Sequence, residues 1–154
     1  MLIEEWMTTA LRSVRPLDSV AHARAILEEH RINQMPVVTD GRLVGIVTDR
    51  DLRDAPTVVK AATAEAGSIE AAEATPGRIS VETVMTTNVL TLKPSDPLEK
   101  AAELMRRERI GAVPIVEKGR LRGILTRSDI LKAFVAMSGK AGGTSRRAST
   151  GKKP

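Results

Sequence analysis

The sequence contains one stretch twice, and this duplication limits the possible folds more than any other feature. Residues 45–51 read GIVTDRD and residues 123–129 read GILTRSD, an offset of 78 positions. The same offset aligns residues 7–54 with the later half of the chain without a gap. The matched pairs include Met7 with Met85, Pro16 with Pro94, Pro36 with Pro114 and Gly41 with Gly119. A tandem duplication of this kind predicts two copies of one folding unit.

The size of each repeat limits the core that it can bury. The chain has 154 residues, so each repeat alone would be marginal, and we expect the two repeats to share a core. One Trp, one Phe and no Tyr predict a core of aliphatic side chains and Met. The absence of Cys excludes disulfides and a thiolate nucleophile. No apolar run is long enough to span a membrane, and these features favour a cytoplasmic protein.

The net charge of +5 is concentrated at one end of the chain. Of the 24 basic residues, five follow Met137 with no acid among them, which leaves 19 basic against 19 acidic residues in the remainder. A neutral body is not expected to bind nucleic acid. The basic tail leaves one alternative open, a salt-sensitive, tail-mediated association with nucleic acid.

Each repeat predicts the element order β-α-β-β-α after a short helical turn at residues 3–7 or 81–85. Short, partly β-branched segments at residues 11–14 and 89–92 predict the first strands. Amphipathic helices follow, with Asp18 and Asp96 at the positions of their N-caps. The Gly at residues 41 and 119 predicts hairpin turns between the next two strands. The last helices begin near residues 49 and 127.

Composition divides the chain into four segments. The first repeat covers residues 1–55 and the second covers residues 79–137. Between them, residues 56–78 form an Ala- and Glu-rich insert that we expect to be partly helical, because Pro56 suits a helix start. Residues 138–154 are rich in Gly, Ser, Thr, Lys and Arg without periodicity, which predicts a flexible tail.

Both repeats resemble the cystathionine-β-synthase (CBS) domain, and the tandem resembles the paired unit called a Bateman module. The resemblance rests on Gly-hydrophobic-hydrophobic-Thr-x-x-Asp after a hairpin, with a hydrophobic-Pro-hydrophobic strand upstream. It covers residues 3–135 except the insert, and the chain looks like the small stand-alone bacterial CBS-pair proteins. It implies an α+β fold in which two β-α-β-β-α repeats pack as a pseudo-two-fold pair, with a helical insert between them.

The resemblance also implies a function, that of a regulatory or sensor module. Such modules bind adenine nucleotides or related adenosyl ligands, such as AMP, ADP, ATP or S-adenosylmethionine, in the cleft between the repeats. In the family, the motif Asp accepts hydrogen bonds from the ribose hydroxyls, and the motif Thr or Ser bonds nearby. By resemblance, Asp51 and Thr48 define one ribose site, and Asp129 and Thr126 define the other. A carboxylate suits this role because it can accept two O–H donors at once.

The resemblance implies an adenine wall for each site, contributed mainly by the opposite repeat. The implied wall residues are Ile46, Met85, Leu90, Ile110, Gly111, Ala112, Ile124, Met7, Ile32, Asn33 and Gln34. The wall facing Asp51 is apolar. The wall facing Asp129 is more polar and crowded, because Arg12 takes the place of an apolar residue there. Nucleotide-sensing members often carry His or Arg before the strand Pro, where this chain has Asn33-Gln34 and Gly111-Ala112; this departure weakens the expectation of high triphosphate affinity.

Phosphate contacts are assigned to Arg50 and Arg127, since both stand where a helix begins and where N-terminal amides favour anions. A structural interpretation remains open beside the functional one. Asp51 and Asp129 also occupy a first helical turn, where a carboxylate stabilises the helix terminus. Arg50 could likewise form only surface ion pairs with the neighbouring acids.

The sequence contains no constellation typical of an enzyme. No His is paired with a nucleophile, no cluster has metal-ligand spacing, and His22 and His30 are interpreted as solvated helix residues. We therefore expect no catalysis, no catalytic cofactor and no metal. The family resemblance implies a homodimer formed through the CBS helices, and an unidentified downstream protein. The alternative from another class is a dimeric interaction scaffold that binds no ligand.

Overall fold

A computed structural model describes residues 1–55 and 79–141. The predicted insert at 56–78 and residues 142–154 of the predicted tail lie outside the described residues. The first repeat contains α1 (Val20–His30), β1 (Gln34–Thr39), β2 (Arg42–Thr48) and a helical stretch at residues 49–55. The second contains α3 (Leu98–Glu108), β3 (Ala112–Glu117), β4 (Arg120–Thr126) and α4 (Arg127–Ala141), and the 3-10 turns η1 (Ile3–Glu5) and η3 (Val81–Thr83) open the two repeats. The predicted α+β class is confirmed.

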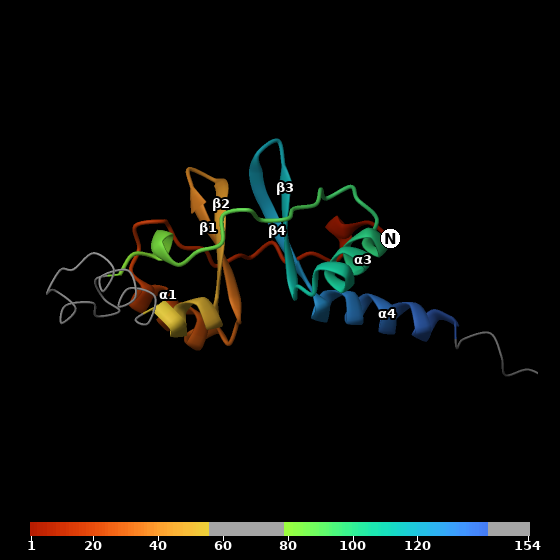
Figure 1. Cartoon of the computed structure of the whole chain (residues 1–154). Coiled ribbons are helices and arrows are strands. Elements are labelled where there is room, and N and C mark those ends of the chain that lie inside the picture. Colours follow the sequence, from red (N-terminus) through yellow and green to blue (C-terminus); the bar gives the residue numbers. More distant parts are fainter. Residues whose placement is uncertain (56–78, 142–154) are drawn as a thin grey trace, which may run out of the picture.

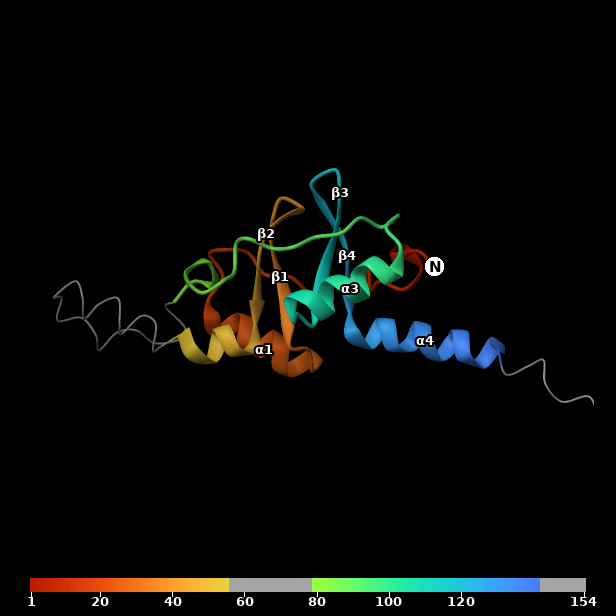
Figure 2. The same ribbon diagram turned by 45° about the vertical axis from the view of Figure 1, so that its right-hand side comes forward.

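The strands form one antiparallel sheet in the order β1-β2-β4-β3. Each hairpin is paired along its length, whereas β2 and β4 meet only where Arg42 lies opposite Arg120. Figures 1 and 2 show the two hairpins side by side, with α1 flanking one and α3 and α4 flanking the other. The repeats are therefore related by a pseudo-two-fold arrangement, as the resemblance implied.

Both hairpin turns have the backbone that the sequence predicted. Asp40 and Gly41 have φ of 52° and 77°, and Lys118 and Gly119 have φ of 51° and 77°. Positive φ at both central residues defines a type I′ turn, whose twist matches the twist of the flanking strands. Each hairpin also contains a register shift, at residues 37/38 and 115/116, which the sequence did not predict.

The prediction of strands at residues 11–14 and 89–92 is wrong. Each is reduced to a single parallel bridge, from Val14 to Val37 and from Leu92 to Ile115. Val14 donates its amide to the Pro36 carbonyl at 3.2 Å and accepts from the Val38 amide at 2.8 Å. The residues before Val14 cross toward the other repeat instead of following β1, so that the ladder cannot extend.

The predicted N-caps also require correction. Ser19 and Pro97 occupy the cap positions of α1 and α3. The carboxylates of Asp18 and Asp96 instead accept the amides of Arg15 and Lys93, both at 2.8 Å, and so close the turns before the helices. The hydrogen bond from the Lys93 amide, together with the nearby ammonium group of Lys100, holds the pKa of Asp96 below its usual value.

The apolar side chains form two cores, and each core includes the opening segment of the other repeat. Ile3, from the first repeat, is buried with Leu98, Ile115 and other residues of the second. Ile79 and Val81, from the second repeat, are buried in the core of the first. Backbone hydrogen bonds fix this exchange: the Ile3 amide donates to the Asp96 carbonyl at 3.0 Å, and the Val81 amide donates to the Asp18 carbonyl at 2.8 Å.

The exchange corrects the expectation of one shared core. In Figure 1 the N-terminus accordingly lies beside α3. Thr8 still pairs with Ile124 of the second repeat, and Thr86 still pairs with Ile46 of the first, so the chain crosses between the repeats after each of these bridges. Each repeat therefore depends on the other for part of its interior, although each has a core of its own.

Helix α4 continues through residues 138–141, which the sequence predicted as the start of the tail. The Ser138 hydroxyl donates to the Phe134 carbonyl at 3.0 Å and so bonds back into the helix. Beyond its first turns α4 has large exposed apolar side chains, at Leu131, Phe134, Val135 and Met137. Within residues 1–55 and 79–141, no helix has the length and apolar content needed to cross a membrane.

Candidate functional site

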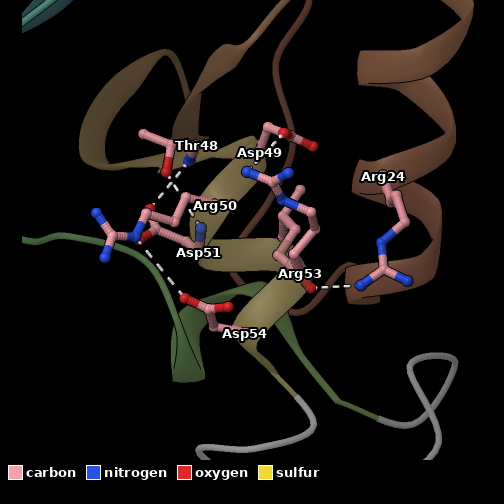
Figure 3. A network of polar contacts seen from close by, with 8 residues as sticks. Arg24, Thr48, Asp49, Arg50, Asp51, Arg53 and Asp54 are labelled. Atoms are coloured by element: carbon pink, nitrogen blue, oxygen red, sulfur yellow. Dashed lines mark hydrogen bonds and ion pairs between the residues drawn. The ribbon is translucent and has the colours of Figure 1, made fainter.

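The repeated Thr-x-x-Asp motif forms the same hydrogen-bonded structure in both repeats. The Thr48 amide donates to Asp51 Oδ2 at 3.0 Å, and the Asp51 amide donates to Thr48 Oγ1 at 3.2 Å (Figure 3). In the second repeat the corresponding distances between Thr126 and Asp129 are 2.9 Å and 3.3 Å. Each pair is a reciprocal capping box at the start of a helix. The structural role considered for the two Asp residues is therefore present.

This capping role leaves part of each carboxylate available. Asp129 Oδ2 accepts from both the amide and the hydroxyl of Thr126, while its Oδ1 lies 3.8 Å from Lys132 Nζ. Among the described residues, no hydrogen bond reaches Oδ1 of Asp51 or of Asp129. A carboxylate oxygen has two acceptor positions, so each Oδ1 can still accept from a ligand hydroxyl.

A cavity of about 650 Å³ lies between the repeats, on the Asp129 side. This volume suits a small organic ligand. Its lining includes seven residues expected in a site, namely Ile32, Asn33, Gln34, Gly111, Ile124, Thr126 and Arg127, and also Arg12. The sequence did not indicate the other lining residues, which are Thr8, Ala10, Leu11, His30, Arg31, Pro36 and Ser128.

Two sets of backbone hydrogen bonds position the walls of this cavity. Thr8 and Ile124 exchange amide-to-carbonyl hydrogen bonds of 2.9 and 3.0 Å, which hold residues 8–12 across the second repeat. The Arg127 amide donates to the Gly111 carbonyl at 3.1 Å and so ties the start of α4 to the start of β3. The same crossing recurs between Ile46 and Thr86 on the Asp51 side.

The remaining predicted site residues lie elsewhere. Met7 and Met85 pack against the two cores and cover Gly123 and Gly45. Ala112 is buried and Ile110 packs on the second core, whereas Leu90 is 45% exposed. Arg50 is an exposed side chain that lies 3.9 Å from Asp54 (Figure 3). Ile46 is half-buried and forms the crossing with Thr86.

The described residues contain no group of three or more His, Asp or Glu side chains that could hold a metal ion. Within residues 1–55 and 79–141, the pKa of Asp96 is lowered, and the hydrogen bond between Glu103 and Arg106 lowers the pKa of Glu103 and raises that of Arg106. These three groups belong to α3 and the turn before it, and none lines the cavity. The chemistry of the cavity therefore rests on hydrogen-bonding groups, basic side chains and an apolar surface.

Comparison with known families and proteins agrees with this architecture. The CBS domain family matches residues 3–57 and 81–136, one match for each repeat. The chain belongs to the CBS domain family, as a tandem pair. The CBS domain-containing protein YhcV of Bacillus subtilis is 30% identical over 142 residues, which cover 92% of this chain and 90% of YhcV.

Solved structures of CBS-domain proteins are similar over most of the chain. CBSX2 in complex with AMP has a TM-score of 0.74 and 29% identity, and the similarity covers 89% of this chain and 98% of CBSX2. The CBS domain pair of protein MJ0100, in complex with 5′-methylthioadenosine and S-adenosyl-L-methionine, has a TM-score of 0.68 and 29% identity over the same shares.

Proposed function

We propose that this protein is a non-catalytic regulatory module that binds an adenosine-containing ligand in the cavity beside Asp129. The observation that carries the proposal is the cavity itself, which is bounded by both repeats and includes Thr126 and the start of α4. The similar structures of CBSX2 and MJ0100 hold AMP, 5′-methylthioadenosine and S-adenosylmethionine, and these ligands share an adenosine group.

The lining residues suggest a role for each part of an adenosine ligand. The unused oxygen of Asp129 would accept from a ribose hydroxyl, with Thr126 beside it. Ile32 and Ile124 would contact the faces of the adenine, while Asn33 and Gln34 supply donors and acceptors for its polar edge. The motif around Asp51 and Thr48 offers a second ribose site with the same geometry.

A ligand in this cavity would regulate through its contacts with both repeats. The ligand would favour the arrangement of the repeats in which both walls of the cavity contact it. A partner protein that binds this arrangement preferentially would then respond to the ligand. The strength of the response is limited by the difference in ligand affinity between the two arrangements.

Asp129→Asn is expected to reduce adenosine-ligand affinity at least about tenfold, because an amide offers one acceptor oxygen and adds a donor that faces the ribose hydroxyls. The parallel variant Asp51→Asn alters the same capping box in the other repeat and so tests the second ribose site. Calorimetric titration with AMP, ADP, ATP, S-adenosylmethionine and NAD would measure both variants, with unfolding curves to show that both are folded.

Two results would contradict this assignment. If Asp51→Asn abolishes binding and Asp129→Asn does not, the ligand occupies the other cleft. If folded wild-type protein binds none of these compounds, the module is not an adenosine sensor, and the alternative of a ligand-free scaffold gains support.

We also propose that the protein forms a homodimer through its helices, and the exposed apolar face of α4 supports this. Leu131 and Phe134 are 63% and 65% exposed, and a groove between α3 and α4 lies next to them. This face is the observation that favours an interaction role, either of the sensor or of a scaffold.

Phe134→Glu is expected to convert a dimer to a monomer, because a charge at the centre of an apolar interface would be buried without a partner. Light scattering after size-exclusion chromatography would measure the mass. Ala136→Glu introduces the same charge at an exposed position that the helical repeat places off this face. A wild-type monomer, or a dimer that survives Phe134→Glu, would exclude dimerisation through this face.

A further inference from the structure

The cavity beside Asp129 differs in charge from the pseudo-symmetric positions around Asp51. Its lining includes three basic residues, Arg12, Arg31 and Arg127, and no acidic residue. Positions related by the offset of 78 hold Leu90, Arg109 and Asp49. Two further positions differ in charge: His30 corresponds to Glu108, and Ser128 corresponds to Arg50. The cavity therefore carries three positive charges, whereas the counterpart positions carry two acids and two bases and are neutral overall.

The basic side chains of the cavity are not engaged by carboxylates of the described chain. Within residues 1–55 and 79–141, Arg12, Arg31 and Arg127 form no ion pair. On the counterpart side, Asp49 lies 3.3 Å from Arg53 and Arg50 lies 3.9 Å from Asp54 (Figure 3). The positive charge of the cavity is thus available to a ligand, whereas Asp49, Arg50 and Glu108 on the counterpart side are each paired with a neighbouring side chain.

The backbone adds to the same preference. Helix α4 spans 15 residues, and Arg127 and Ser128, which both line the cavity, form its first turn with Asp129. Amides at a helix N-terminus and the helix dipole favour an anion. The nearby acid, Asp129, is 5% exposed, accepts hydrogen bonds from Thr126 and has Lys132 at 3.8 Å, so that its charge is partly offset.

The three Arg residues come from different parts of the fold, which explains why the sequence did not group them. Arg12 belongs to the segment that crosses between the repeats, and Arg31 is the C-cap of α1 with a φ of 52°. Arg127 opens α4. Asn33 and Gln34, three and two positions before Pro36, stand where the sequence offered no basic residue.

Resting on the proposed function, we propose that this cavity selects an adenosine ligand with a chain of two or three phosphates, and that the site around Asp51 does not. Three Arg side chains and a helix N-terminus provide the donors that phosphate oxygens require. Neutral adenosine would leave these charges unused. S-adenosylmethionine would place a sulfonium cation near them, which like-charge repulsion disfavours.

The first test titrates the full chain with adenosine, AMP, ADP, ATP and S-adenosylmethionine, without divalent cations, at low and high salt. ATP is expected to bind at least about tenfold more tightly than adenosine, and the preference should decrease at high salt because the Arg side chains are exposed. ATP no tighter than adenosine, or S-adenosylmethionine tighter than ATP, would overturn the inference.

The second test replaces Arg12 by Leu, the residue at its counterpart position. Arg12→Leu is expected to weaken ATP about tenfold and to leave adenosine affinity unchanged. Arg53→Leu is the matched control, since it removes the same charge from an exposed side chain that does not line the cavity and introduces the residue found at the corresponding position 131, and it should alter neither affinity. Equal losses of ATP in both variants would overturn the inference, as would an equal loss of ATP and adenosine in Arg12→Leu.

These measurements separate the inference from the function on which it rests. Adenosine binding without any preference for phosphate would refute the charge selectivity and leave an adenosine sensor. No binding of any adenosine compound to folded protein would refute both.

Discussion

Gly123→Ala is expected to lower the free energy of unfolding by about 2 kcal/mol, a cost typical of overpacking in a filled interior. A Cβ at Gly123 would lie 2.8 Å from Met7 Sδ and 2.9 Å from the Thr8 carbonyl oxygen. The sulfur can move, but this carbonyl accepts the Ile124 amide at 3.0 Å in the crossing between the repeats. The added methyl group must therefore displace hydrogen-bonded backbone. Gly45→Ala should behave alike, because its Cβ would lie 2.9 Å from the Thr86 carbonyl oxygen.

Urea denaturation followed by circular dichroism would measure this loss. Gly139→Ala is the matched control, since apart from its own stretch of helix no atom of the described residues lies within 4 Å of the position its Cβ would take. In helix α4 this change should be neutral or stabilise by up to about 1 kcal/mol, because Ala favours the helix more than Gly. If Gly123→Ala were as stable as Gly139→Ala, the motif Gly would not be required for the close approach of the repeats.

These glycines show how far local pattern could predict the fold. The turn at Asp40-Gly41, the hairpins and the starts of the last helices follow from neighbouring residues, and the structure confirms them. The single bridge at Val14 could not be predicted in this way, because it depends on where residues 8–12 cross the other repeat. Nor does any local pattern indicate that Ile3 is buried in the second core.

The residues of the candidate site also fall into two groups, those that a local pattern indicated and those that only the structure showed. The duplicated motif and the family resemblance indicated Ile32, Asn33 and Thr126 before the structure placed them around one cavity. Thr8 and Arg31 were missed, since one belongs to a crossing and the other to a helix C-cap. The sequence also could not show which of two similar motifs faces a cationic cavity, because that charge is assembled from distant segments.

Ile3→Ala is expected to destabilise the protein by about 3 kcal/mol, within the usual range for a fully buried Ile. Ile3 has no exposed surface and belongs to the core of the second repeat. The prediction therefore concerns where the protein is destabilised as well as by how much. Although Ile3 lies at the start of the first repeat, Ile3→Ala should weaken β3 and β4 more than β1 and β2.

Hydrogen exchange resolved along the chain would measure this location, together with the fluorescence of Trp6, which packs against the same core. Val81→Ala is the symmetric counterpart, since Val81 is fully buried in the core of the first repeat. It should cost less, about 2 kcal/mol, because Val is smaller, and its loss of protection should be greatest in β1 and β2.

Leu2→Ala controls for any change near the N-terminus, because Leu2 is 40% exposed and should contribute less than about 1 kcal/mol. If Ile3→Ala weakened β1 and β2 first, the exchange of opening segments would not occur in solution. If it weakens β3 and β4 first, each repeat is completed by the other. Any ligand that alters the packing between the repeats would then also act on the stability of both cores, since the segments that complete the cores lead directly into the crossings that line the cleft.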